Sequence, residues 1–337
     1  MPLKLHCRHA MRTNALYFPY IEPPEDEWLY LMLLYWNKLS SIVPSEYVDK
    51  PQRFSPHMSA LMAEGLVNPV VPQGLIDDKE EFGKPFLGFI SRRVRARKTQ
   101  LRDDTTVCRV PIHVEKLGPV ADELVELNLA TYTGYPWYEM DSWVANAFMS
   151  YLASFIGSLP EVDSAPITNN EICFSLLGGY PRKFTGQRII QRYEVLKGIF
   201  PFPNTGVNLH EVIEFKEKYG DELARFRDHI EGLCIELSNI RNPDDREEKK
   251  QIEVRRLQQE IDYIAGRMQG TWHEIVFLDI LPVLSGGALS LPTVIYQSIE
   301  RRKNRALLYD HPLAYGALLK RQWPHLQDRN RRGQSAR

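Results

Sequence analysis

Two series of apolar residues between positions 208 and 269 constrain this chain more than any other feature. Steps of four and three residues separate the members of each series, the spacing of the buried face in a pair of packed helices. The first series is Tyr219, Leu223, Phe226, Ile230, Leu233 and Leu237, and the second is Val254, Leu257, Ile261, Ile264 and Met268. Each spans only about two to three heptads, so part of it is expected to rest on a globular body.

The segment between the two series carries signals that end one helix and begin another. Asn242 can cap a helix, and Pro243 suits the first turn that follows such a cap. Asn208 with Glu211 three residues later forms a similar start signal before the first series. The pattern therefore predicts two antiparallel helices joined by a short turn.

The outer faces of this predicted hairpin are highly charged, and four arginines on it are candidate interaction residues: Arg225, Arg227, Arg255 and Arg256. One interpretation is a solvated surface, and the other is an arm that binds a partner or a second copy. Arg225 and Arg227 flank Phe226, where an arginine stem usually covers apolar surface and its head pairs with a carboxylate.

The composition is that of an ordinary globular protein and does not point to a particular function. Of 337 residues, 43% are hydrophobic and 25% are charged, and the net charge of -1 exerts no global attraction toward nucleic acid or membrane. The four cysteines lie far apart without CxxC spacing, which argues against a zinc motif or a disulfide framework. With no signal-peptide pattern at the start, we expect a cytoplasmic protein.

The rest of the chain predicts an α-rich α+β fold with a small mixed sheet and buried helices beside the long hairpin. Strands are expected at Ala15–Ile21, Val107–Val114 and Gln187–Phe200, and core helices at Glu25–Ile42 and Asp141–Ser158. Shorter elements are expected as helices at Pro56–Glu64, Asp77–Arg97 and Pro119–Asn128, and as a strand at Val67–Val71, while Pro160–Asn170 reads as a turn-rich link.

These elements predict three parts. Residues 1–205 would form an α/β body, residues 206–270 the hairpin, and residues 271–337 a helical segment that packs on the body and ends in a frayed basic tail. The most apolar stretch, Ile275–Tyr296, is long enough to span a membrane, but Asp279, Pro282 and Pro292 interrupt it. A buried core hairpin is therefore preferred to a membrane-active segment.

One strongly basic cluster stands out in this nearly neutral chain: Arg92, Arg93, Arg95, Arg97, Lys98 and Arg102. Such a run is a candidate for binding nucleic-acid phosphates. The alternative is a solvated helix end whose charges complement the helix dipole. No aromatic residues are interleaved with the cluster, which weakens the interpretation as a single-strand stacking surface.

Catalytic motifs are absent from the sequence, and one polar cluster is the best remaining candidate. There is no phosphate-binding loop, no GxSxG, no HExxH and no Cys/His metal spacing, so no cofactor or metal is expected. His113, Glu115 and Lys116 follow a predicted strand, where sites in α/β proteins often form. A satisfied histidine beside a surface ion pair is the alternative.

Several short segments resemble a family of bacterial proteins of unknown function, over about residues 14–270. They include Tyr17-Phe-Pro-Tyr20, Trp28-Leu29, Leu34-Tyr35-Trp36, Ile112-His113, Pro166-Ile-Thr168 and Leu223-Ala-Arg-Phe-Arg227. The resemblance departs at Thr168-Asn169, where the family favours Thr-Asp. It implies a bacterial cytoplasmic origin and supplies neither an activity nor a catalytic residue.

Three functions follow from these features, in order of preference. The first is a non-catalytic interaction or assembly protein, of a bacterial defence or stress system, that binds a protein partner or forms a homo-oligomer. The second is a nucleic-acid-binding or nucleic-acid-processing protein that uses the Arg92–Arg102 cluster. The third, a membrane-acting effector using Ile275–Tyr296, is the least favoured.

Overall fold

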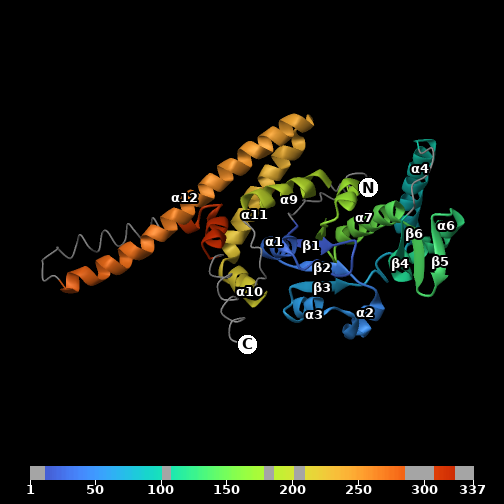
Figure 1. Ribbon diagram of the computed structural model, residues 1–337, viewed down its shortest axis with the longest axis horizontal. Helices are drawn as coiled ribbons and strands as arrows, with labels where there is room; N and C mark the ends of the chain where they lie inside the picture. The colour runs from blue at the N-terminus through green and yellow to red at the C-terminus, as the bar shows by residue number, and fades with distance from the viewer. Residues whose placement is uncertain (1–11, 101–107, 178–185, 201–208, 285–306, 323–337) are drawn as a thin grey trace, which may run out of the picture. The chain divides into compact units, whose positions relative to one another are not determined.

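The chain divides into two compact units, Met1–Ile189 and Ile190–Arg337, in a computed structural model (Figure 1). The structure describes residues 12–100, 108–177, 186–200, 209–284 and 307–322. Helices dominate both units, and the strands lie in the first, so the predicted α-rich α+β class is confirmed.

A four-stranded parallel sheet forms one half of the first unit, in the order β3-β2-β1-β7. The strands are β1 (Asn14–Tyr17), β2 (Leu39–Ile42), β3 (Val67–Val70) and β7 (Ser164–Ile167). Ala15, Leu16 and Tyr17 are fully buried, as expected for a central parallel strand covered on both faces. The two prolines of the sheet, Pro69 and Pro166, lie in its edge strands, where a missing N–H is tolerated.

A separate antiparallel sheet has the order β4-β6-β5. Its strands are β4 (Arg109–His113), β5 (Ala130–Gly134) and β6 (Trp137–Asp141). Ile112 and Met140 are buried and belong to the core that α7 (Ser142–Ser158) and α4 (Lys84–Gln100) share. Alternation along β4 and β6 leaves the opposite face more exposed.

Helix α7 is the centre of the first unit. Its Asp141 cap accepts from the N–H of Trp143, and thirteen of its residues are buried. Gly157 lies so close to β7 that an added Cβ would come within 2.4 Å of the Ser164 carbonyl oxygen. Only glycine therefore allows the helix to approach the sheet this closely.

Shorter helices complete this unit. They are α1 (Glu27–Tyr35), α2 (Ser45–Asp49), α3 (Pro56–Ala63), α5 (Val114–Leu117), α6 (Ala121–Glu126) and α8 (Glu171–Leu177), with a π-helical turn at Lys79–Gly83 and 3-10 turns at Pro51–Arg53 and Gly118–Val120. The predicted short helices and the Val67–Val71 strand are confirmed to within a few residues.

The second unit is helical. It contains most of α9 (Gly186–Ile199), then α10 (Leu209–Lys218), α11 (Gly220–Asn239) and α12 (Pro243–Leu284), and a further helix over residues 314–322. The predicted turn is confirmed, since Pro243 begins α12 and the Asn242 side chain accepts from the N–H of Asp244. The predicted first helix is two helices, broken between Lys218 and Gly220; the proposed Asn208 cap lies outside the described residues.

Both heptad series are buried inside this unit, apart from the half-buried Val254. The helix over residues 314–322 contributes Tyr315, whose ring lies 5.8 Å from that of Phe226 and 5.2 Å from that of Phe215. A Cβ on Gly316 would touch the Ile261 side chain at 3.0 Å. On the other side, Phe200 packs on Phe226 at 5.6 Å, and Arg192 of α9 pairs with Glu231 of α11.

Four predictions about the strands and helices are wrong. Gln187–Phe200 is not a strand but helix α9, because Ile189, Tyr193, Leu196 and Phe200 follow a period of four and three. The helix expected at Glu25–Ile42 ends at Tyr35, and its last residues form β2. Ala15–Ile21 and Val107–Val114 contribute to two different sheets, while the supposed link Pro160–Asn170 contains β7.

The three-part division at residues 205 and 270 stays a prediction, and so does the packing of residues 271–337. Of the Ile275–Tyr296 stretch, the backbone to Leu284 continues α12 and the remainder lies outside the described residues. Across the described chain, no helix is both long enough and apolar enough to cross a membrane.

Candidate functional site

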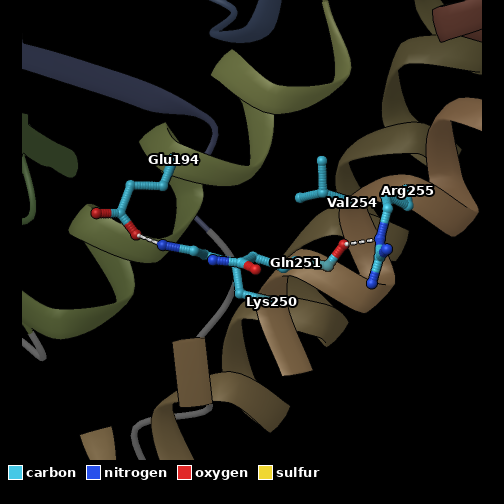
Figure 2. Close-up of a pocket in the computed structure, with 5 residues that line it drawn as sticks. All are labelled: Glu194, Lys250, Gln251, Val254 and Arg255. Atoms are coloured by element: carbon cyan, nitrogen blue, oxygen red, sulfur yellow. Dashed lines mark hydrogen bonds and ion pairs between the residues drawn. The ribbon is translucent and has the colours of Figure 1, made fainter. Parts of the chain in front are cut away.

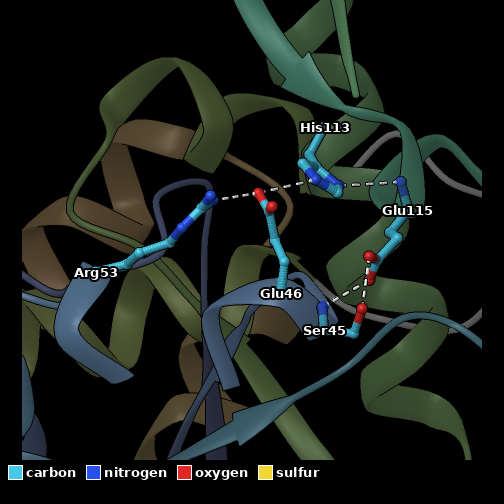
Figure 3. Close-up of polar contacts among 5 residues, drawn as sticks. All are labelled: Ser45, Glu46, Arg53, His113 and Glu115. Atoms are coloured by element: carbon cyan, nitrogen blue, oxygen red, sulfur yellow. Dashed lines mark hydrogen bonds and ion pairs between the residues drawn. The ribbon is translucent and has the colours of Figure 1, made fainter. Parts of the chain in front are cut away.

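The polar cluster predicted around His113 forms where β4 ends, and it includes residues from the chain after β2 (Figure 3). His113 is the N-cap of α5, and its Nδ1 accepts from the N–H of Glu115 at 3.2 Å. Glu46, Ser45 and Arg53 come from α2 and the turn that follows it. The cluster thus joins the antiparallel sheet to the chain that leaves the parallel sheet.

The hydrogen bond at Nδ1 determines the state of the histidine ring. Because Nδ1 accepts a hydrogen bond, the ring proton of a neutral His113 is on Nε2. Nε2 lies 3.3 Å from Glu46 Oε1. Burial lowers the pKa of His113, and the negative charges of Glu115 and Glu46 raise it by a smaller amount. The Trp137 ring packs edge-on against the imidazole at 5.2 Å, and His113 is only 3% exposed.

The two glutamates of the cluster hold other groups. Glu115 Oε2 accepts from the Ser45 N–H at 2.6 Å, and its Oε1 accepts from the Ser45 hydroxyl at 2.7 Å. This caps the N-terminus of α2, where a carboxylate is favoured by the free N–H groups and the helix dipole. Glu46 Oε1 also lies 2.6 Å from Arg53 Nη1. Both carboxylates are therefore engaged within the cluster.

Among the described lysines of the first unit, Lys116 has the most strongly lowered pKa. It is 6% exposed, and burial lowers its pKa to about 8. A lysine with such a pKa is partly neutral near physiological pH, the state in which an amine can act as a base or nucleophile. The sequence predicted His113, Glu115 and Lys116 but not Ser45, Glu46 and Arg53, whose only signal was the Pro44-Ser45 helix start.

The basic cluster lies on α4. Arg92 and Arg93 are exposed, and the Arg93 guanidinium lies 5.2 Å from the centre of the Phe89 ring. The backbone of Arg95, Arg97 and Lys98 continues α4, and Arg102 lies outside the described residues. The structure thus confirms a helix that carries Arg92 to Lys98 and shows the guanidinium groups of Arg92 and Arg93 at its surface.

The four interaction candidates fall into two groups. Arg225 donates to the Tyr309 carbonyl at 2.9 Å and lies 3.7 Å from Glu222, and Arg227 is buried at 3% exposure. Arg255 and Arg256 are exposed on α12. The first two therefore make contacts within the second unit, and the α12 pair is the more exposed.

An open cavity of about 360 Å³ lies beside this pair, between α9 and α12 (Figure 2). Its lining is Glu194, Lys250, Gln251, Val254 and Arg255. The Lys250 amine lies 2.5 Å from Glu194 Oε2 and 2.6 Å from Glu247 Oε2, so its charge is balanced by two carboxylates. Within the described residues, no group of three or more His, Cys, Asp or Glu side chains could hold a metal ion.

Comparison with known proteins finds a family match for part of this chain. Residues 171–277 match a family of unknown function, DUF6236. The match runs from α8 into α12, so the expected resemblance to an uncharacterised family is confirmed there. The DUF6236 match does not extend to residues 14–170, over which the resemblance was also expected. No curated protein and no solved structure matches the chain.

Proposed function

We propose that this protein is a non-catalytic interaction protein, and that it binds another protein through the exposed face of α12. The observation that carries the proposal is a stripe of exposed residues along that helix, opposite its buried series: Ile252, Arg256, Gln259, Tyr263 and Gly266. We call these residues the α12 outer stripe. Its steps of four, three, four and three place all five on one side of the helix.

The α12 outer stripe is not needed to close the core of the second unit. The buried face of α12 consists of Leu257, Ile261, Ile264 and Met268, each at most 3% exposed. By contrast, Ile252 is 45% exposed and Tyr263 is 66% exposed. Scattered exposed apolar residues are common, but an aromatic and an aliphatic side chain on one helical face beside arginine are typical of a contact surface.

The state of the His113 cluster supports a non-catalytic role. His113 Nδ1 accepts from the Glu115 N–H and its Nε2 lies 3.3 Å from Glu46, while the Glu115 carboxylate accepts from Ser45 and that of Glu46 lies 2.6 Å from Arg53. A general acid or base needs a proton-transfer position that faces a substrate. The contacts of this cluster instead stabilise the joint between α2 and β4.

Two matched charge reversals test the proposal, because the described part of the chain has two adjacent pairs of exposed arginines on helices. Arg255→Glu/Arg256→Glu changes the face of α12, and Arg92→Glu/Arg93→Glu changes α4. We expect the first variant to lose the complexes that the tagged full-length protein forms on gentle purification, and the second to retain them. Complexes that persist in the α12 variant and disappear in the α4 variant would contradict the proposal.

Nucleic-acid binding is the second candidate, favoured by the exposure of Arg92 and Arg93 at the surface of α4. Phosphate contacts by such side chains make binding weaken steeply as salt rises. The same two variants separate the candidates, since salt-sensitive retention of nucleic acid would then depend on Arg92 and Arg93 and not on the α12 pair. A place in a bacterial defence or stress system stays a prediction.

A further inference from the structure

Helix α11 carries an exposed stripe of its own, with the same spacing as the α12 outer stripe. Asp221, Ala224, Asp228, Gly232 and Ile235 are all exposed and lie three, four, four and three residues apart. We call these residues the α11 outer stripe. Ile235 is 41% exposed, and a Cβ on Gly232 would meet nothing within 4 Å, so this face of α11 is open.

The two stripes differ in charge and in side-chain size. The α11 outer stripe has Asp221 and Asp228, with Glu236 exposed at its margin, whereas Arg255 and Arg267 are exposed at the margins of the α12 outer stripe around Arg256. Asp228, Glu236 and Arg256 form no ion pair with any residue in the described part of the chain. Their charges are therefore available to a partner.

An antiparallel alignment brings complementary residues of the two stripes together. Ile235 aligned with Ile252 places Gly232 beside Arg256, Asp228 beside Gln259, Ala224 beside Tyr263 and Asp221 beside Gly266 and Arg267. Each stripe spans 15 residues, about 21 Å of helix from its first to its last residue, so the two have equal length. Small residues then face large ones, and the acidic groups lie within about one helical turn of the arginines.

We propose that the partner is a second copy of this chain, with α11 of each copy docked antiparallel on α12 of the other. This inference rests on the proposed function and names the occupant of the α12 face. A twofold axis parallel to the helices forms both contacts at once, as in a closed, self-complementary dimer. The four helices then form a bundle whose inner faces are the two outer stripes.

A charge exchange between two variants tests this contact. Arg255→Glu/Arg256→Glu makes α12 acidic, and Asp228→Arg/Glu236→Arg makes α11 basic. Each variant alone places like charges at the contact, so light scattering is expected to give the mass of one chain. An equal mixture of the two restores opposite charges at both contacts and is expected to regain the mass of two chains.

The remaining outcomes distinguish this inference from the proposed function. A mixture that keeps the mass of one chain overturns the α11–α12 contact. If the α12 variant loses the mass of two chains and the α11 variant keeps it, α12 contacts the second copy without α11, which overturns the α11–α12 contact and leaves the proposed function standing. If both variants keep the mass of two chains, the dimer contact lies elsewhere and this inference is overturned, whereas the proposed function is contradicted only if the α12 variant also retains the complexes found on gentle purification. Asp228→Asn/Glu236→Gln, which adds no repulsion, should weaken the dimer less than Asp228→Arg/Glu236→Arg.

Discussion

At the scale of single residues, the chain places its ionisable groups in two kinds of environment. Around His113, Glu115 accepts from Ser45 and Glu46 lies against His113 and Arg53 inside the first unit, whereas Lys116 is buried with a depressed pKa. On α11 and α12, Asp228 and Arg256 are exposed. The buried groups around His113 affect stability, and the exposed charges on α11 and α12 are positioned to affect association.

Lys116 gives a prediction about pH. Its pKa is lowered from 10.5 to about 8, so between these values the unfolded chain binds a proton that the folded chain does not. Stability should therefore rise with pH through this window because of Lys116. Lys116→Met should have a larger free energy of unfolding than the wild type at neutral pH. This difference between variant and wild type should shrink, by at most about 3 kcal/mol, as the pH rises toward 10.5.

Urea unfolding of the wild type and Lys116→Met over this pH range measures the effect. Lys38→Met, at an exposed position, is the control for replacing a lysine. A stability difference between Lys116→Met and wild type that stays constant with pH would show that burial does not depress this amine.

At the scale of elements, helix α7 approaches strand β7 unusually closely in the first unit. Gly157 on α7 and Gly88 on α4 are both helical, but their surroundings differ. A Cβ at Gly157 would meet the Ser164 carbonyl at 2.4 Å, and a Cβ at Gly88 would meet nothing within 4 Å. These two glycines therefore form a natural pair for comparison.

Alanine substitution should have opposite effects at the two positions. Gly88→Ala should be neutral or stabilising by up to about 1 kcal/mol, because alanine favours the helix. Gly157→Ala should destabilise by roughly 1–3 kcal/mol, because α7 must move away from β7. Thermal unfolding of both variants measures this, and equal melting temperatures would be inconsistent with the close approach.

The sequence predicted an element correctly where its apolar residues recurred at the spacing of a helix or a strand. The predictions were wrong where nearly all residues are apolar, because such a segment shows no spacing. The heptad spacing of Tyr219–Leu237 led to α11 correctly, and Asp141 led to the start of α7. The Trp28–Trp36 run is apolar throughout and hid the period of α1, so the polar break at Asn37-Lys38 and the strand after it were read as one helix. Strand β7 was missed because Pro166 suggested a turn.

The sequence predicted only half of the residues in the His113 cluster. His113, Glu115 and Lys116 are adjacent in the chain, so a local pattern revealed them. Their partners Ser45 and Glu46 lie about seventy residues earlier and are brought to them by tertiary folding. The α11 outer stripe was also missed, since its small and charged residues resemble an ordinary solvated face until the burial of Phe226 and Ile230 defines the opposite side.

At the scale of the whole molecule, the second unit combines a closed core with two exposed faces. Helix α12 has 42 residues and α11 has 20, about 63 Å and 30 Å of helix, so α12 continues well past its neighbour. The core seals the heptad series from solvent, and the outer stripes remain available. This arrangement is the basis for the proposal that the protein acts by association.

The mass of the untagged full-length protein in solution, measured by light scattering over a range of concentrations, tests this account most directly. One chain is 39.1 kDa. We predict twice that mass at high concentration for the wild type and for Arg92→Glu/Arg93→Glu, and the mass of one chain for Arg255→Glu/Arg256→Glu. A wild-type protein that keeps the mass of one chain at every concentration would contradict the account.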